Sequence, residues 1–87
     1  MYKVEYSKRA VKELQKLDKS ISAALISWID KNLDGCEDPK QFGKALKGSL
    51  SPFWRYRIGD YRILASIEDD RLIIVVIRVG HRREVYR

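Results

Sequence analysis

The chain has 87 residues, of which 45% are hydrophobic and 34% are charged. This length and composition predict one small folded domain over residues 1–87 and exclude a disordered chain. The formal charge of +6 favours an anionic partner, either a nucleic acid or an acidic protein. A single cysteine, Cys36, excludes an internal disulfide framework and indicates a reducing compartment.

Several kinds of segment and site are missing from the sequence. The chain opens with an alternating run and not with a basic segment followed by an apolar stretch, so no signal peptide is evident. No apolar run is long enough to cross a membrane, and we expect a cytoplasmic protein with no membrane partner. Cys/His clusters with metal spacing, a Gly-rich phosphate loop and a GxSxG elbow are also lacking. We therefore expect no metal site and no cofactor.

The first part of the chain predicts one strand and two helices. Residues 2–6 alternate apolar and charged side chains, as a half-buried strand does. Residues 8–17 have a helical apolar stripe, with Ser7 in the capping position. Asp18 or Ser20 can cap a second helix, and so short a link predicts an antiparallel helical hairpin. The second helix should end near Asp34, before Gly35, and the expected buried residues are Ala10, Val11, Leu14, Leu17, Ile21, Ala24, Leu25, Trp28, Ile29 and Leu33.

Residues 36–51 predict an irregular segment, because prolines and glycines interrupt them. Phe42 and Leu46 are the residues expected to attach this segment to the core. Farther along, residues 72–77 are apolar without alternation, which predicts an interior strand covered on both sides. A short, charge-dense tail follows this strand. The predicted order of elements is β-α-α-β-β-β.

Residues 54–67 predict a β-hairpin around the two-residue loop Gly59-Asp60. Closing this loop sets Ile58 opposite Tyr61, Arg57 opposite Arg62, Tyr56 opposite Ile63 and Trp54 opposite Ala65, in order from the loop. Because side chains alternate along a strand, one side of the hairpin is apolar. We call the other side the arginine face, which consists of Arg55, Arg57 and Arg62. Like charges that oppose each other across a sheet are unfavourable, and a bound polyanion would compensate for this.

The residues available for chemistry fit metal-free cleavage of RNA. Arginine forks match phosphate oxygens and stay charged at any working pH. Such cleavage also needs proton transfer from a 2′-OH and to a 5′-oxygen. Histidine titrates near neutral pH, so His81 is a candidate proton carrier, and Tyr86 can act as a base in a cationic neighbourhood. Composition and spacing alone leave a basic binding module open, with these residues as a solvated tail and a core aromatic.

Two motifs carry a resemblance to a known family. Trp54-Arg55-Tyr56-Arg57-Ile58-Gly59-Asp60-Tyr61-Arg62-Ile63 and Val79-Gly80-His81-Arg82-Arg83-Glu84-Val85-Tyr86 resemble the RelE/ParE superfamily of bacterial and archaeal toxins, closest to RelE-like mRNA interferases. The resemblance implies an α+β fold in which the helical hairpin packs on a mainly antiparallel twisted sheet. It also implies the toxin of a type II toxin-antitoxin system that cuts mRNA in the ribosomal A site without a metal. The 2′-OH would attack the adjacent phosphate and leave a 2′,3′-cyclic phosphate and a 5′-OH.

The same resemblance implies roles for individual residues. Arg55 and Arg57 match basic positions that hold the phosphate and stabilise the transition state, and Arg62 matches a phosphate-contacting arginine. Arg82 matches the arginine that follows the Gly-His or Gly-Lys step. Tyr86 matches a tyrosine that serves as base or stacks on an unpaired base.

Some positions depart from the family pattern or extend it. His81 stands where some relatives have lysine, so it is a candidate acid or base, with a hydrogen-bonded tail residue as the alternative. Lys47 and Arg83 are expected to extend the substrate-binding surface. Arginine replaces lysine at two basic positions, which removes a proton donor with an adjustable pKa.

The resemblance also implies partners and leaves alternatives open. The expected partners are a RelB-like antitoxin, whose acidic disordered segment folds over the basic face, and the ribosomal A site with its mRNA. One alternative is a ParE-like, gyrase-inhibiting toxin, against which the terminal Val85-Tyr86 argues. The other is a non-catalytic basic module that binds RNA or an antitoxin.

Overall fold

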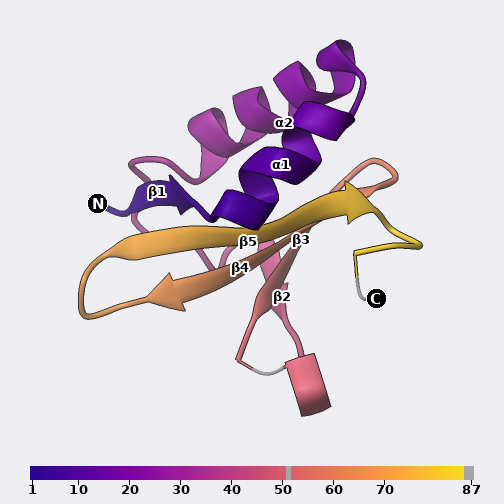
Figure 1. The fold of residues 1–87 in the computed structure, drawn as a ribbon. Coiled ribbons are helices and arrows are strands. Elements are labelled where there is room, and N and C mark those ends of the chain that lie inside the picture. The colour runs from indigo at the N-terminus through magenta and orange to yellow at the C-terminus, as the bar shows by residue number, and fades with distance from the viewer. Residues whose placement is uncertain (51, 86–87) are drawn as a thin grey trace.

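The computed structural model describes residues 1–50 and 52–85. Five strands form one sheet in the order β1-β5-β4-β3-β2, in which only the β1–β5 pair is parallel. Both helices lie on the same side of this sheet (Figure 1). The predicted α+β fold with a mainly antiparallel sheet is confirmed. The elements are β1 (Lys3–Tyr6), α1 (Lys8–Lys16), α2 (Lys19–Asn32), β2 (Gly43–Ala45), the 3-10 helix η1 (Gly48–Leu50), β3 (Trp54–Ile58), β4 (Tyr61–Glu68) and β5 (Ile73–His81).

Each helix begins at a capped residue. The Ser7 Oγ accepts the N–H of Ala10 at 3.0 Å, as the sequence predicts for α1. Asp18 caps α2 by accepting the N–H of Ser20 at 3.0 Å, which decides between the two predicted caps. None of the described helices has the length and apolar character needed to cross a membrane.

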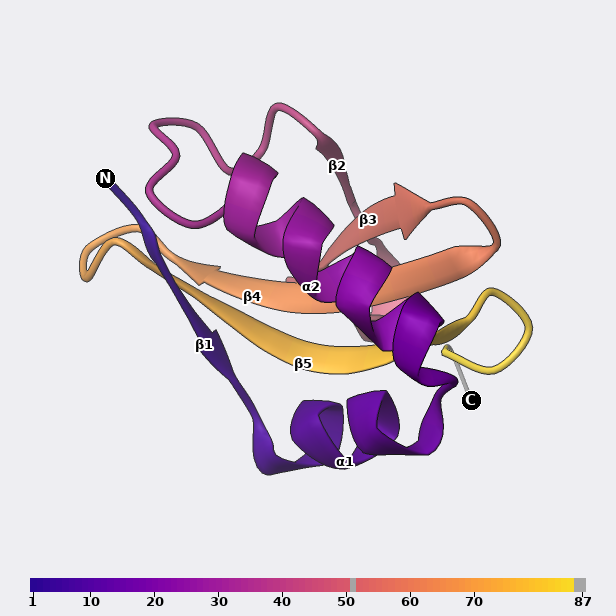
Figure 2. The same cartoon turned by 90° about the horizontal axis from the view of Figure 1, so that it is seen from above.

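The helices differ in how they cover the sheet. Viewed from above, α2 crosses the strands and α1 lies beside β5 (Figure 2). Two predicted core residues, Val11 and Ala24, are wrong, because both are exposed. They are exposed because each helix buries only the narrow side that touches the sheet. A groove of about 640 Å³ with mostly apolar walls is left between the helices.

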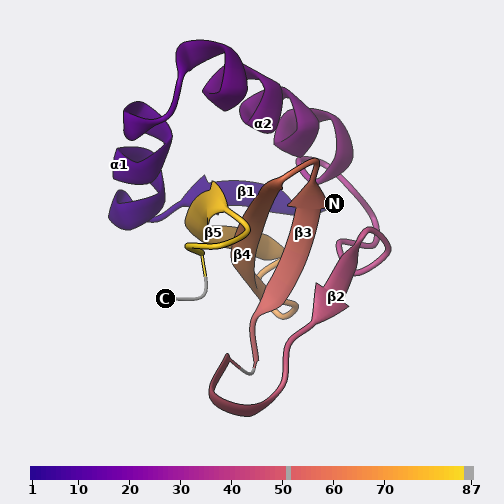
Figure 3. The ribbon, with the colours of Figure 1, turned by 90° about the vertical axis from the view of Figure 1, so that its right-hand side faces the viewer.

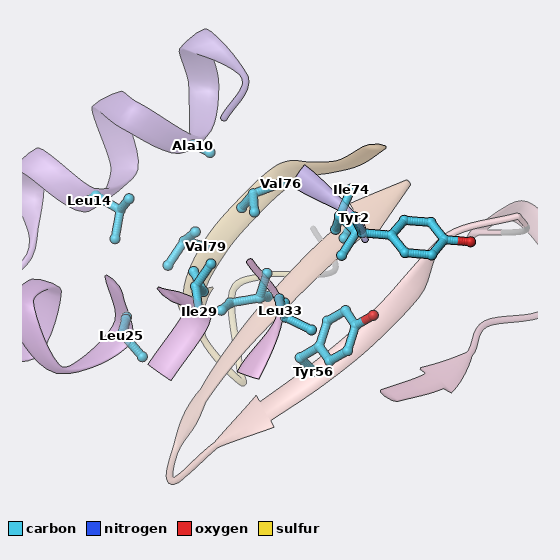
Figure 4. Packing of buried hydrophobic residues seen from close by; sticks show 12 residues of the cluster. Tyr2, Ala10, Leu14, Leu25, Ile29, Leu33, Tyr56, Ile74, Val76 and Val79 are labelled. Carbon is cyan, nitrogen blue, oxygen red and sulfur yellow. The ribbon is translucent and has the colours of Figure 1, made fainter. Parts of the chain in front are cut away.

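The core lies between the helices and one face of the sheet. Side chains of α1 and α2 point toward side chains of β3 and β5 (Figure 4). The hairpin register predicted around Gly59-Asp60 is confirmed at every predicted pair. Gly59 has a φ of +58°, which glycine adopts without strain. The buried cluster consists of Tyr2, Ala10, Leu14, Leu25, Ile29, Leu33, Tyr56, Ile63, Ala65, Ile74, Val76 and Val79.

Two expectations for the second half need correction. The segment predicted to be irregular contains the short strand β2, which pairs with β3 at the sheet edge. Phe42 is 48% exposed and only touches Trp28 edge-on, so it is a rim residue and not a core residue. The strand β5 is interior, as predicted. Its two faces are unequal, because Ile74 and Val76 are buried by the helices while Val75 is half-buried.

Gly43 is the residue of β2 at which added volume should be most costly. A Cβ built there would lie 2.8 Å from Cε1 of Tyr56, a fully buried ring whose hydroxyl donates to the Pro39 carbonyl. We expect Gly43→Ala to lower the free energy of unfolding by about 1–3 kcal/mol, measured by urea denaturation. Gly80→Ala is the matched control, because a Cβ built at Gly80 would have no atom within 4 Å outside its chain neighbours. Equal stability of the two variants would contradict this packing.

The start of the chain is fastened to the β4–β5 turn by one carboxylate. The Tyr2 hydroxyl donates to Asp69 Oδ1 at 2.7 Å, and the Lys40 ammonium lies 3.3 Å from Oδ2. These two donors, Tyr2 first, lower the pKa of Asp69 below its usual value. A lowered pKa in the folded state means that the carboxylate stabilises the fold above about pH 4, and that this contribution is lost as acid protonates it.

We therefore expect Tyr2→Phe to be less stable than the parent chain at neutral pH and to approach it in acid. Urea denaturation of both proteins at about pH 7 and about pH 2.5 measures the difference between their free energies of unfolding. The same difference at both pH values would show that the Tyr2 hydroxyl does not act through Asp69.

Candidate nucleic-acid interface

The register of the central strands places the arginine face on the side of the sheet away from the helices. Arg57 pairs directly with Arg62, and Arg55 pairs with Leu64. Directly opposed residues share a face, and Tyr56 and Ile63 on the other face are fully buried under the helices. The predicted grouping of the three arginines is thus present in the structure. Figure 3 shows the helices on one side of the sheet only.

The three arginines have different surroundings. Arg57 is exposed, and Arg55 is half-buried with an Nε that has no hydrogen-bond partner within the described residues. Arg62 is only 6% exposed, and its Nη1 donates to the carbonyls of Gly59 at 2.9 Å and Tyr61 at 3.0 Å. Arg62 therefore fixes the hairpin turn and adds positive charge beneath the face. No described carboxylate forms an ion pair with Arg55 or Arg57, so both remain available to an anion.

The tail beyond β5 returns toward the same side of the sheet. The N–H of Arg82 donates to the carbonyl of Asp60 at 2.9 Å, which joins the tail to the hairpin turn. The N–H groups of Glu84 and Val85 both donate to the carbonyl of His81, at 2.8 and 3.2 Å. Figures 1 and 3 show the chain turning away from the helices after β5. Arg82 and the neighbouring Arg83 are exposed on this turn.

The imidazole of His81 is not brought together with the arginine face. His81 pairs with Tyr61, and the two rings meet edge-on with centroids 5.7 Å apart. Tyr61 packs on the helix side, where His81 lines a pocket of about 300 Å³ with Glu13 and Glu84. The Nδ1 of His81 accepts the N–H of Arg83 at 3.3 Å. The His81 ring thus makes a hydrogen bond within the tail, and its role as an acid or base stays a prediction.

The remaining predicted site residues lie around the face or outside the described chain. Lys47 is exposed in the loop between β2 and η1, and this loop extends away from the helices (Figures 1 and 3). Tyr86 lies outside the described residues. Across residues 1–50 and 52–85, no group of three or more His, Cys, Asp or Glu side chains is placed to hold a metal.

The places of two basic residues of this region were not predicted. Lys44 is a positive charge close to the hairpin in the sequence, but that it pairs with Arg55 and shares its face could not be predicted without β2. Arg78, whose guanidinium contacts Glu13 and the Val85 carbonyl, was counted as part of the tail. The sequence pattern that could have indicated its role is a single charged residue inside an otherwise apolar run from residue 72 to residue 79.

Comparison with known proteins identifies the family. The chain matches the family described as ParE toxin of type II toxin-antitoxin system, parDE, over residues 4–86. It is 34% identical to Toxin RelG of Mycobacterium tuberculosis, covering 99% of this chain and 97% of that protein. It is 30% identical to Toxin RelE of the same organism, covering 99% and 87%.

Solved structures show the same fold. The toxin-antitoxin complex RelBE2 of Mycobacterium tuberculosis contains a chain with a TM-score of 0.85 and 33% identity, covering 93% of this chain and 98% of that one. The archaeal RelE-RelB complex of Pyrococcus horikoshii gives a TM-score of 0.73 at 27% identity, covering 97% and 98%. The chain therefore belongs to the RelE/ParE superfamily of type II toxin-antitoxin toxins, with RelE-like toxins among its relatives.

Proposed function

We propose that this toxin is a ribosome-dependent endoribonuclease that cleaves mRNA in the A site. The observation that carries the proposal is the arginine face, where Arg55 and Arg57 have no ion-paired carboxylate within the described residues. Two residues apart on one strand, they stand about 7 Å apart along β3 and can contact one extended RNA strand together. Arg82 is exposed on a turn that is bonded to the same hairpin.

The proposed reaction uses these groups for charge and position. The 2′-OH attacks the adjacent phosphorus, the bond from phosphorus to the 5′-oxygen breaks, and a 2′,3′-cyclic phosphate and a 5′-OH result. Arg55 and Arg57 neutralise the charge that develops on the phosphate oxygens. Arg82 stabilises the charge on the leaving oxygen, which takes a proton from water. The resemblance makes Tyr86 either the base that takes the proton of the 2′-OH or a ring that stacks on an unpaired base. His81 is the other candidate acid or base, and its ring position favours a role in holding the tail.

The proposed inhibitor is a RelB-like antitoxin with an acidic segment. Relatives of this chain have been solved as RelBE2 and RelE-RelB complexes. A disordered acidic segment gains from charge complementarity when it orders on a basic surface. The arginine face, extended by Lys44, is the surface we propose that it covers.

A second candidate is a ParE-like toxin that inhibits gyrase. The observation that favours it is the family match, which carries the description of a ParE toxin. In this case the arginine face would bind protein and would perform no chemistry on RNA.

Inducible expression in a bacterial host distinguishes these functions. We expect growth arrest that a neighbouring acidic open reading frame relieves, together with cuts in a reporter mRNA mapped by primer extension. Growth arrest with gyrase-linked DNA breaks and intact mRNA would favour the second candidate. Normal growth at full expression would contradict both and leave a non-catalytic basic module.

A further inference from the structure

One largely buried ion pair joins three parts of the molecule that are separate in the sequence. The side chains of Glu13 in α1 and Arg78 in β5 are only 21% and 14% exposed. Arg78 Nη2 and Nε lie 3.1 and 3.4 Å from Glu13 Oε2. Glu13 Oε1 accepts the N–H of Val79 at 2.9 Å, and Arg78 Nη1 donates to the Val85 carbonyl at 2.8 Å. One carboxylate and one guanidinium thus connect the first helix, the edge of β5 and the tail.

The position of Glu13 has a structural reason. β1 pairs with β5 only as far as Val76, so the rest of that edge needs other hydrogen-bond partners. Ser7 supplies two of them, because its N–H donates to the Val76 carbonyl and its Oγ to the Ile77 carbonyl, both at 2.9 Å. Glu13 then accepts the N–H of Val79, which satisfies a further donor on this edge. These edge bonds involve Ser7 and Glu13, and none of them is made by the Arg78 side chain.

Arg78 instead acts on the tail. It pairs with Leu64, so it starts on the same side of the sheet as the arginine face. Its bond to the Val85 carbonyl holds the end of the turn on which Arg82 and Arg83 are exposed. The Val85 side chain is also fully buried, so the end of the turn is held both by this hydrogen bond and by burial.

We propose that Arg78 is a positioning residue that aligns the turn bearing Arg82 with the arginine face, and that Glu13 holds Arg78 in place. This inference rests on the proposed cleavage of mRNA. Groups that stabilise a transition state must be placed accurately, and a displacement of about 1 Å can lower a rate by about 10²-fold. Arg78 supplies that accuracy without touching the substrate.

The test compares two variants of Arg78 with a matched control. Arg78→Gln removes the charge. Arg78→Lys keeps the charge, but a single ammonium group lacks the separate N–H donors with which the guanidinium contacts Glu13 and the Val85 carbonyl together. Arg9 is the control residue, because it also pairs with Glu13, at 3.8 Å, but is 60% exposed. We expect Arg9→Gln to behave like the parent chain, since exposed pairs contribute little.

Two measurements separate positioning from cleavage. Hydrogen exchange of the Arg82, Glu84 and Val85 amides reports the order of the tail and should become at least about tenfold faster in both Arg78 variants. In ribosomal cleavage assays we expect kcat to fall by about 10- to 100-fold with KM nearly unchanged. If Arg78→Gln does not fold, Arg78→Lys decides the result.

Cooperative thermal unfolding shows that an Arg78 variant is folded. In such a variant, unchanged hydrogen exchange of the tail amides would overturn the inference. Faster exchange of these amides with an unchanged kcat would also overturn it. A parent chain that cuts no mRNA would contradict the proposed function instead. The exchange data would then still decide whether Arg78 orders the tail.

Discussion

Replacing Arg57 with alanine is expected to slow single-turnover cleavage of mRNA in stalled ribosomal complexes by about 10²- to 10³-fold. Arg57 is exposed on the arginine face, and no described carboxylate forms an ion pair with it. Its removal should therefore leave the fold intact and take away charge that is needed most when the phosphate becomes pentavalent. Arg57→Lys should recover only part of the rate, because an ammonium lacks the bidentate fork.

Lys31→Ala is the matched control for this loss of charge. Lys31 is exposed near the end of α2, on the side of the sheet away from the arginine face. It should cleave at nearly the parent rate. His81→Gln should also lose less activity than Arg57→Ala, because the His81 ring lies beside Tyr61 on the helix side. Comparable losses in Arg57→Ala and Lys31→Ala would mean that net charge matters and that the arginine face does not.

The largest expected loss of stability follows truncation of Ile29. This side chain is fully buried between α2 and the sheet, whereas Ile26 on the same helix is 38% exposed. We expect Ile29→Ala to lower the free energy of unfolding by about 2–5 kcal/mol, because the truncated side chain leaves a cavity that the surrounding residues fill only in part. Ile26→Ala should cost less than about 1 kcal/mol, as surface changes usually do. Urea denaturation of both variants measures the difference, and equal losses would contradict the assigned packing of α2.

The hairpin could be predicted from the sequence because its signals are local. Gly59-Asp60 fixes the loop length, the loop length fixes the register, and alternation then fixes which side chains share a face. The arginine face follows from these steps without any knowledge of the remaining chain. The caps of both helices are local in the same way, since Ser7 and Asp18 bond to residues two or three positions away.

Features that depend on distant contacts could not be predicted in this way. β2 is only three residues long and exists because it pairs with β3, so the sequence could not show that Lys44 shares the arginine face. The partnership of Glu13 with Arg78 spans 65 positions in the sequence. The side on which His81 lies depends on how far β5 continues. The apolar run ends at residue 79, but the strand continues to His81 and pairs it with Tyr61.

The claim that the arginine face works on mRNA is tested most directly by the chemistry of the cut ends. The purified toxin is added to ribosomes stalled with a defined codon in the A site, and the fragments are mapped and analysed. We predict a cut within the A-site codon, a 2′,3′-cyclic phosphate on the upstream fragment and a 5′-OH on the downstream fragment that accepts label from a kinase without prior phosphatase treatment. Intact mRNA, or fragments with a 5′-phosphate, would contradict the account.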